Sequence, residues 1–211
     1  MNNLINDNFI FDLILGSLLG DGSIEKPSGL SKEYTISFHQ SKEKESKYIK
    51  LKHDIISTKF NINNIRPGNN NTLRFSLSHR LTKDKEFTEM IRPLVRDIDN
   101  NRIFPDINLV TPVVLLFWYL DDGSFPISKQ IRKSGKINIH RKIKITLQSY
   151  KDEDIIRFTE LLNDKFDLNF KTSTQIIKNQ IKITDIIISN NIRSGIIFFI
   201  RLTASTELSE T

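Results

Sequence analysis

Two aspartates, Asp21 and Asp122, are the residues of this sequence whose type and spacing point most directly to chemistry. Each ends an apolar run and is followed by Gly and then Ser. The runs are Ile14-Leu-Gly-Ser-Leu-Leu-Gly-Asp-Gly22 and Leu115-Leu-Phe-Trp-Tyr-Leu-Asp-Asp-Gly123. The two carboxylates are 101 positions apart in a chain of 211 residues, close to half its length. We interpret the runs as two helices that pack side by side, each bringing one aspartate to a shared metal site.

The composition excludes several kinds of site and favours one class of partner. The chain has no cysteine, which excludes disulfides, zinc fingers and thiol nucleophiles. Its 31 Lys and Arg outnumber its 25 Asp and Glu, and the net charge of +6 favours a polyanionic partner. The apolar runs are too short to span a bilayer, and the N-terminus resembles neither a signal peptide nor a transit peptide. We therefore expect no membrane association.

Hydrophobic periodicity predicts the elements that position Asp21. A helix begins at Phe9, with Asp7 or Asn8 as its cap, and is apolar on nearly all sides, so we expect it to be buried. Gly22 ends it and suits a left-handed C-terminal conformation. Further along the chain, the residue pattern predicts a loop over 23–31, a strand over 33–41, a helix over 42–60, a hairpin over 62–78 and a helix over 84–96.

The second half repeats this order. Residues 97–110 lack periodicity and are predicted to be a linker. The helix of the second motif begins at Thr111-Pro112, where Thr is a good N-cap and Pro suits the first helical turn. After a basic, loop-like stretch over 125–141, the sequence predicts a strand over 143–148, a helix over 152–166, a hairpin over 168–187 and a weak helix over 190–202.

Further matches support a duplication. Gln40-Ser41 ends the first strand and Gln148-Ser149 ends its counterpart. Lys59-Phe60-Asn61 and Lys165-Phe166-Asp167 close the following helices. These landmarks predict two halves, residues 1–97 and 111–211, joined by a linker at 98–110 and related by a pseudo-two-fold axis near the motif helices.

These motifs resemble the paired motifs of LAGLIDADG homing endonucleases of the single-chain, double-motif type. The first copy keeps Gly16, Asp21 and Gly22, whereas the second keeps Asp122-Gly123 and has Phe117 in place of the small third residue. The resemblance covers nearly the whole chain up to about residue 187. It implies an α+β fold made of a duplicated αββαββα unit, whose two curved antiparallel sheets straddle duplex DNA, in an enzyme that cuts both strands.

The resemblance also implies roles at the site. Asp21 and Asp122 would be catalytic and would hold Mg²⁺ or Mn²⁺, because such ions prefer carboxylate, phosphate and water oxygens. The backbone carbonyls of Gly20 and Asp121 could add ligands. Three further residues are catalytic candidates. Gln40 and Gln148 would order water, and Arg102 would stabilise phosphate charge.

The predicted strands expose hydrogen-bonding and basic side chains on one face, as a DNA-binding sheet requires. These candidates are Thr35, Ser37, Arg74, Ser76, Ser78, Lys142, Lys144, Thr146, Lys182 and Thr184. Because both motifs lie in one chain, the expected protein is a monomer. Because the two motifs are unequal, the expected partner is double-stranded DNA with a long asymmetric site.

Two alternatives stay open. The same basic surface could bind group I intron RNA, in a maturase that assists splicing. The C-terminus, which lacks the basic segment usual in relatives, also fits a DNA-binding relic without catalysis. The abundance of Ile, Asn and Lys indicates an A/T-rich genome, so we expect a mitochondrial protein, with the chloroplast as the alternative.

Overall fold

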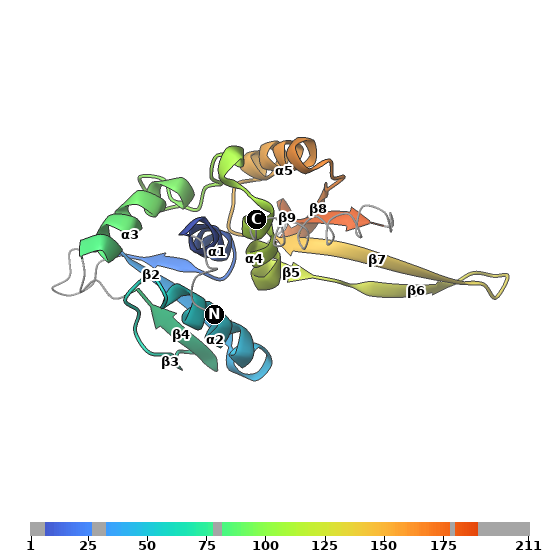
Figure 1. Cartoon of the computed structure of the whole chain (residues 1–211). Coiled ribbons are helices and arrows are strands. Elements are labelled where there is room, and N and C mark those ends of the chain that lie inside the picture. The colour runs from blue at the N-terminus through green and yellow to red at the C-terminus, as the bar shows by residue number, and fades with distance from the viewer. Residues whose placement is uncertain (1–6, 27–32, 78–81, 178–179, 190–211) are drawn as a thin grey trace, which may run out of the picture. The chain divides into compact units, whose positions relative to one another are not determined.

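The structure, a computed structural model, describes residues 7–26, 33–77, 82–177 and 180–189. The chain divides into two compact units, unit 1 (residues 1–100) and unit 2 (residues 101–211). Each unit combines helices with its own antiparallel sheet, which confirms the predicted α+β class (Figure 1). Within the described ranges, no helix has the length and apolar character needed to cross a membrane.

Unit 1 follows the predicted αββαββα order. Its elements are α1 (Asp7–Leu19), β1 (Ser23–Glu25), β2 (Thr35–Ser41), α2 (Lys42–Ile56), β3 (Arg66–Pro67), β4 (Thr72–Ser76) and α3 (Thr82–Val95). The strands pair in the order β1-β2-β4-β3, and all neighbours are antiparallel. The expected loop over 23–31 was wrong at residues 23–25, because three residues show no periodicity and their pairing with β2 makes them a strand.

The core of unit 1 lies between the sheet and its helices. Phe38 of β2 and Phe75 of β4 stack with ring centres 4.8 Å apart, and His53 of α2 meets the Phe75 ring edge-on. Phe87 of α3 makes an edge contact with Phe11 of α1. One face of the sheet therefore packs on helices, and the alternate residues of β2 lie on the opposite face.

Unit 2 repeats the order as far as the structure describes it. Its elements are a 3₁₀ turn η1 (Ile107–Leu109), α4 (Pro112–Asp122), β5 (Gly123–Ser124), β6 (Ile127–Ile131), β7 (Ile137–Thr146), α5 (Asp152–Phe166), β8 (Lys171–Ile177) and β9 (Gln180–Ser189). The sheet order is β5-β7-β9-β8, and β6 pairs with β7. The predicted weak helix over 190–202 lies outside the described residues.

Residues 125–141 were expected to begin as a loop, but residues 127–141 form a hairpin. β6 and the first half of β7 pair from Ile127↔Arg141 to Ile131↔Ile137. The turn is closed by a hydrogen bond from Arg132 N to Lys136 O (2.9 Å), with Gly135 at φ +76°. The prediction failed because the density of Lys and Arg hid an alternation of isoleucine with polar residues.

The stretch expected to be a linker contributes to the core of unit 2. Phe104 stacks on Tyr150 and on Phe158, with ring centres 4.0 and 4.2 Å away. Lys165 of α5 donates to the carbonyls of Ile107 and Asn108 at 2.7 and 3.2 Å. Residues 103–109 are therefore held against α5.

Candidate functional site

Asp21 lies where α1 turns into the sheet. The helix is buried from Asp12 to Leu19, whereas Asp21 is exposed. The turn is tight, since Gly22 N donates to Ser17 O at 2.7 Å and a Cβ on Gly22 would lie only 2.6 Å from that oxygen. Gly22 does not adopt the left-handed conformation that we expected, because its φ is not positive. Close packing of backbone, rather than dihedral freedom, requires glycine here.

Asp122 occupies the corresponding place at the end of α4. The Thr111 side chain caps this helix as predicted, accepting from Val114 N at 3.2 Å, and Pro112 begins it. Gly123 bonds through its N–H to Tyr119 O, and a Cβ at Gly123 would collide with Tyr119. Asp122 is half-buried. Burial also raises the pKa of the Tyr119 phenol, because desolvation disfavours its charged form.

Both aspartates thus lie at the C-terminal end of an apolar helix and directly precede a glycine where the chain enters the sheet. Ser23 pairs with Ser37 of β2, and Ser124 pairs with Lys144 of β7. A carboxylate at a helix C-terminus adds to the partial negative charge of the last carbonyls, and this favours a cation. These oxygen donors fit Mg²⁺ or Mn²⁺. In the described part of the chain, no three His, Asp or Glu residues group together as metal ligands.

The strand register places Gln40 and Gln148, which we matched by sequence, at positions that do not correspond. Taking Ser23↔Ser37 and Ser124↔Lys144 as equivalent pairs makes Ser37 the counterpart of Lys144. Gln40 then corresponds to Leu147, and both are buried. Gln148 lies one residue further on and is exposed. Gln40 lies within β2, whereas Gln148 lies beyond the end of β7, so the two glutamines are not equivalent in this register.

Arg102 lies in unit 2, beside the aromatic cluster. Its guanidinium carbon is 6.0 Å from the centre of the Tyr150 ring, and the residue is half-buried. Tyr150 in turn stacks on Phe104. The position of Arg102 is therefore tied to the core of unit 2.

On the outer face of the sheet in unit 1, charged residues surround an acid that sequence reasoning missed. One carboxylate oxygen of Glu25 lies 3.5 Å from His39 Nε2, and the other lies 4.0 Å from an Arg74 guanidinium nitrogen. Thr35 and Arg74 are half-exposed, as a surface that contacts a partner requires. Ser37 and Ser76 share this face but are buried, and Ser76 accepts from Asn63 at 3.0 Å. Ser78 lies outside the described residues.

Unit 2 has a similar polar face with its own buried acid. Lys144 pairs with Asp185 at 3.1 Å, and the Thr184 hydroxyl donates to the other oxygen of Asp185 at 2.7 Å. Thr184 lies at a bulge between β8 and β9 and is buried, whereas Lys142 is exposed. Lys182 donates to the Gln148 carbonyl at 2.8 Å. The sequence alone did not single out Asp185, because it is the one acid in β9 and its burial depends on the strand pairing.

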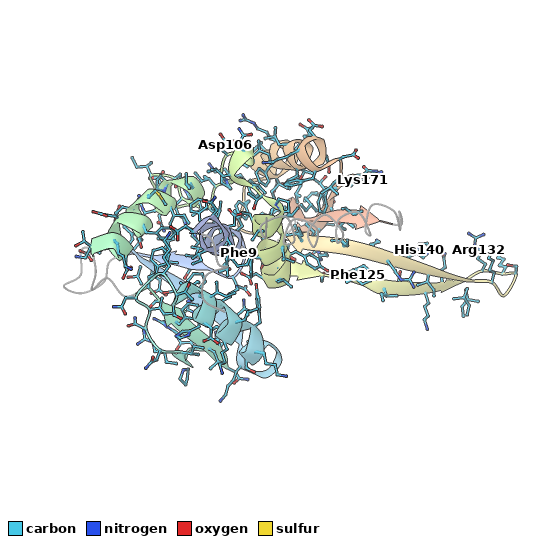
Figure 2. All side chains as sticks on the ribbon, in the orientation of Figure 1. Phe9, Asp106, Phe125, Arg132, His140 and Lys171 are labelled. Carbon is cyan, nitrogen blue, oxygen red and sulfur yellow. The ribbon has the colours of Figure 1, made fainter. Side chains whose placement is uncertain are left out.

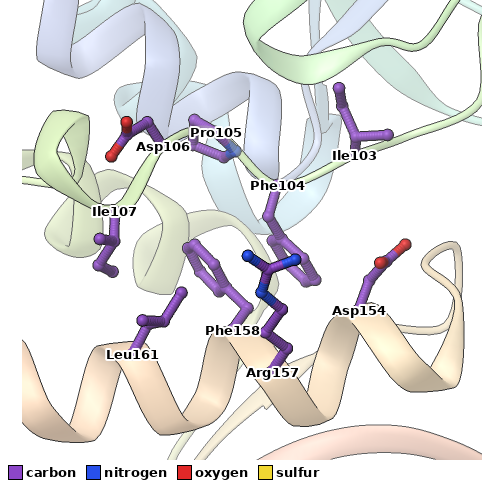
Figure 3. Close-up of a pocket in the computed structure, with 9 residues that line it drawn as sticks. All are labelled: Ile103, Phe104, Pro105, Asp106, Ile107, Asp154, Arg157, Phe158 and Leu161. Atoms are coloured by element: carbon purple, nitrogen blue, oxygen red, sulfur yellow. The ribbon is translucent and has the colours of Figure 1, made fainter.

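A pocket of about 470 Å³ lies elsewhere in unit 2, between residues 103–107 and α5 (Figure 3). Phe158 and Leu161 extend into it from α5, with Asp106, Asp154 and Arg157 among its other lining residues. It contains none of the motif residues. The motif aspartates, and not this pocket, are therefore the candidate residues for chemistry.

Comparison with known proteins identifies solved structures with the same fold. The fold is similar to that of the homing endonuclease I-WcaI bound to its DNA recognition sequence, with TM-score 0.60 and 17% identity over 92% of this chain and 80% of that one. It is also similar to the LAGLIDADG meganuclease I-AabMI bound to uncleaved DNA, with TM-score 0.59 and 10% identity over 97% and 92%. The structure of I-DmoI in complex with DNA and Mn matches with TM-score 0.50 and 15% identity over 93% and 97%.

No curated protein matches the sequence. The sequence itself matches the LAGLIDADG DNA endonuclease family over residues 11–187, a stretch that includes both motifs and nearly all of both sheets. The chain therefore belongs to the LAGLIDADG DNA endonuclease family.

Proposed function

We propose that this protein is a site-specific DNA endonuclease that cuts both strands of its target by metal-dependent hydrolysis, as intron homing requires. The observation that carries the proposal is the repeated placement of Asp21 and Asp122. In each unit the aspartate directly precedes a glycine where the chain enters the sheet. Membership of a DNA endonuclease family supports the same reaction class.

The carboxylates of Asp21 and Asp122, with the carbonyls of Gly20 and Asp121, would hold Mg²⁺ or Mn²⁺. A divalent ion supplies an activated water and stabilises the charge on the departing oxygen. The solved complex of I-DmoI with DNA and Mn supports the use of such an ion. Gln40 and Gln148 remain candidates for ordering water, and Arg102 for stabilising phosphate charge.

The polar faces of the two sheets would bind the duplex. Charge in unit 2 is segregated along the sequence, since residues 123–151 contain eight Lys or Arg and no acid. Residues 152–167, which include α5, contain six acids and two bases. A polyanion is therefore attracted to the sheet and repelled from α5. Contacts would come from candidates that are at least partly exposed, such as Arg74 and Lys142.

A cleavage selection tests this function. The wild-type protein is incubated with Mg²⁺ and a library of randomised duplexes, and the cleaved products are sequenced. We expect a long asymmetric consensus. With that duplex, Asp21→Asn and Asp122→Asn should each reduce double-strand cutting by at least about 10³-fold while binding changes little, because each removes a charged metal ligand. Absence of cleavage by folded wild-type protein in Mg²⁺ and in Mn²⁺ would refute the nuclease reading.

The basic stretch 123–151 also favours a second candidate, an RNA maturase acting on its host group I intron. The Asp21→Asn/Asp122→Asn double variant separates the two activities. Splicing that survives in this variant would establish a maturase, whereas failure to bind the intron would exclude one. Specific binding of duplex without cutting by the wild type would instead indicate a DNA-binding protein that has lost catalysis.

A further inference from the structure

The β6–β7 hairpin of unit 2 has a portion that stands beyond the sheet. We call this portion the arm; it comprises β6, the turn at 132–136 and residues 137–141 of β7. Pairing of β7 with β9 begins at Lys142↔Ser189, and β5 pairs with residues 144–145. Among the described strands, residues 137–141 pair with β6 alone. Figure 1 shows β6 and this part of β7 extending away from the rest of unit 2.

The arm has two chemically different faces. Pairing places Ser128 opposite His140, and their face continues along β7 through Lys142 and Lys144 into the polar face of the sheet. Gln130 also lies on this face and is exposed. The other face contains Lys129 and Arg141 together with four exposed isoleucines, Ile127, Ile131, Ile137 and Ile139, which are 57%, 73%, 57% and 48% exposed. The first face continues the polar face of the sheet, whereas isoleucines make most of the other face apolar.

The arm is the most cationic part of unit 2. Residues 127–141 contain five Lys or Arg and no Asp or Glu. Three of the five, Arg132, Lys133 and Lys136, lie in the turn and are exposed. Figure 2 shows Arg132 at the far end of the arm, with His140 nearer its middle. Such a distribution places positive charge where a ribbon in the major groove would meet phosphates.

Unit 1 has a shorter connection at the corresponding place. From Ser23 to its partner Ser37 the chain advances 14 residues, whereas from Ser124 to its partner Lys144 it advances 20. Six extra residues lengthen a hairpin by three residues on each strand, or about 10 Å at a rise of roughly 3.3 Å per residue. With about 3.4 Å between base pairs, this corresponds to about three base pairs of DNA.

We infer that the two half-sites of the DNA target differ in length. The half-site bound by unit 2 extends about three base pairs further from the cleavage centre than the other. Ser128, Gln130 and His140 set base preference in that extension. This inference rests on the proposed function. Gln130 suits the N6 and N7 atoms of adenine, with which an amide forms two hydrogen bonds. Arg132, Lys133 and Lys136 hold the adjacent phosphates, which fixes the arm on the duplex without reading sequence.

The experiment is the cleavage selection in Mg²⁺ with randomised duplexes, followed by measurement of base preference at each position. We expect a longer half-site on one side. Ser128→Ala/Gln130→Ala should remove the preference at its outermost positions, a loss of about tenfold or more in discrimination, and should leave the inner positions unchanged. The matched control is Ile127→Thr/Ile131→Thr, whose residues alternate with the first pair along the same strand and lie on the opposite face. It should retain every preference.

Half-sites of equal length would overturn the inference while leaving the nuclease function intact. Loss of preference at inner positions, or the same loss in the isoleucine control, would also overturn it. If no duplex is enriched, the proposed function fails and the inference fails with it. Matching thermal unfolding curves for the wild type and both variants ensure that changes in preference are not changes in folding.

A second measurement addresses the turn. Arg132→Gln/Lys133→Gln/Lys136→Gln should reduce the slope of log affinity against log salt for the selected duplex by about 2 to 3, because each lost phosphate contact releases roughly 0.9 fewer counterions. Base preferences should stay as in the wild type. An unchanged slope would show that the turn does not reach DNA and would overturn the extended half-site.

Discussion

At the scale of single residues, the position of each motif aspartate depends on the glycine that follows it. Gly22 and Gly123 differ in context but share one constraint, since a Cβ at either position would collide with the last turn of the preceding helix. At Gly123 the obstacle includes both the carbonyl and the ring of Tyr119. The glycines therefore let the chain enter the sheet immediately after the carboxylate.

Gly123→Ala tests this constraint. We expect the free energy of unfolding to fall by about 1–3 kcal/mol, because backbone and a packed ring must move to admit the methyl group. Cleavage should fall as well, since Asp122 is the adjacent residue. Chemical denaturation and the cleavage assay measure the two effects. The neighbouring Ser124→Ala, at an exposed position, should leave both nearly unchanged, and a stable, fully active Gly123→Ala protein would show that the turn tolerates a side chain.

The Lys144–Asp185 pair provides a second residue-scale prediction. Asp185 is almost fully buried and accepts from both Lys144 and Thr184. Asp185→Ala should cost about 1–3 kcal/mol, because it removes the acceptor of a buried hydroxyl and leaves the ammonium group without its partner. Urea unfolding measures the loss. Glu160→Gln, at an exposed position of α5, is the control, and equal stability of the two variants would contradict a stabilising role for the pair.

At the scale of elements, the segment before α4 packs against the core of unit 2. Phe104 lies between Tyr150 and Phe158, with interplanar angles of 5° to each ring. The segment is also held to α5 by Lys165. The start of α4, and hence Asp122 at its end, is therefore attached to the core through this cluster.

Phe104→Ala should reduce the stability of unit 2 by about 2–3 kcal/mol, through lost burial and two lost stacking contacts. Thermal and urea unfolding, followed by the fluorescence of Trp118, would report on it because Trp118 borders the same cluster. Phe125→Ala removes a phenylalanine that is 46% exposed and should cost much less. If the two substitutions cost the same, the segment does not contribute to the core as described.

At the scale of the whole molecule, one chain contains two units with the same order of elements and one motif aspartate each. A protein built this way needs no second copy to supply the second carboxylate. The two polar faces also differ, with a Glu25 network in one unit and the Lys144–Asp185 pair in the other. Unequal faces suit a target without internal symmetry.

We therefore expect one chain to bind one duplex. Sedimentation of the wild-type protein with the selected duplex in Ca²⁺, under conditions without cutting, should give a 1:1 complex and a monomer in the absence of DNA. The mass should not change over a tenfold range of protein concentration. A complex with two chains per duplex would contradict the single-chain reading of the paired motifs.

The sequence by itself determined the features that depend on neighbouring residues. The two Asp-Gly motifs, the Thr111 cap and the helix over 152–166 follow from local periodicity and capping, and the duplication follows from repeated landmarks. The tertiary structure alone decided what depends on pairing between distant segments. The strand register showed that Gln40 and Gln148 do not occupy corresponding positions in the two units. The folded structure also showed that Ser37, Ser76 and Thr184 are buried. A shift of one residue in pairing exchanges the faces of a strand, and no local pattern specifies that shift.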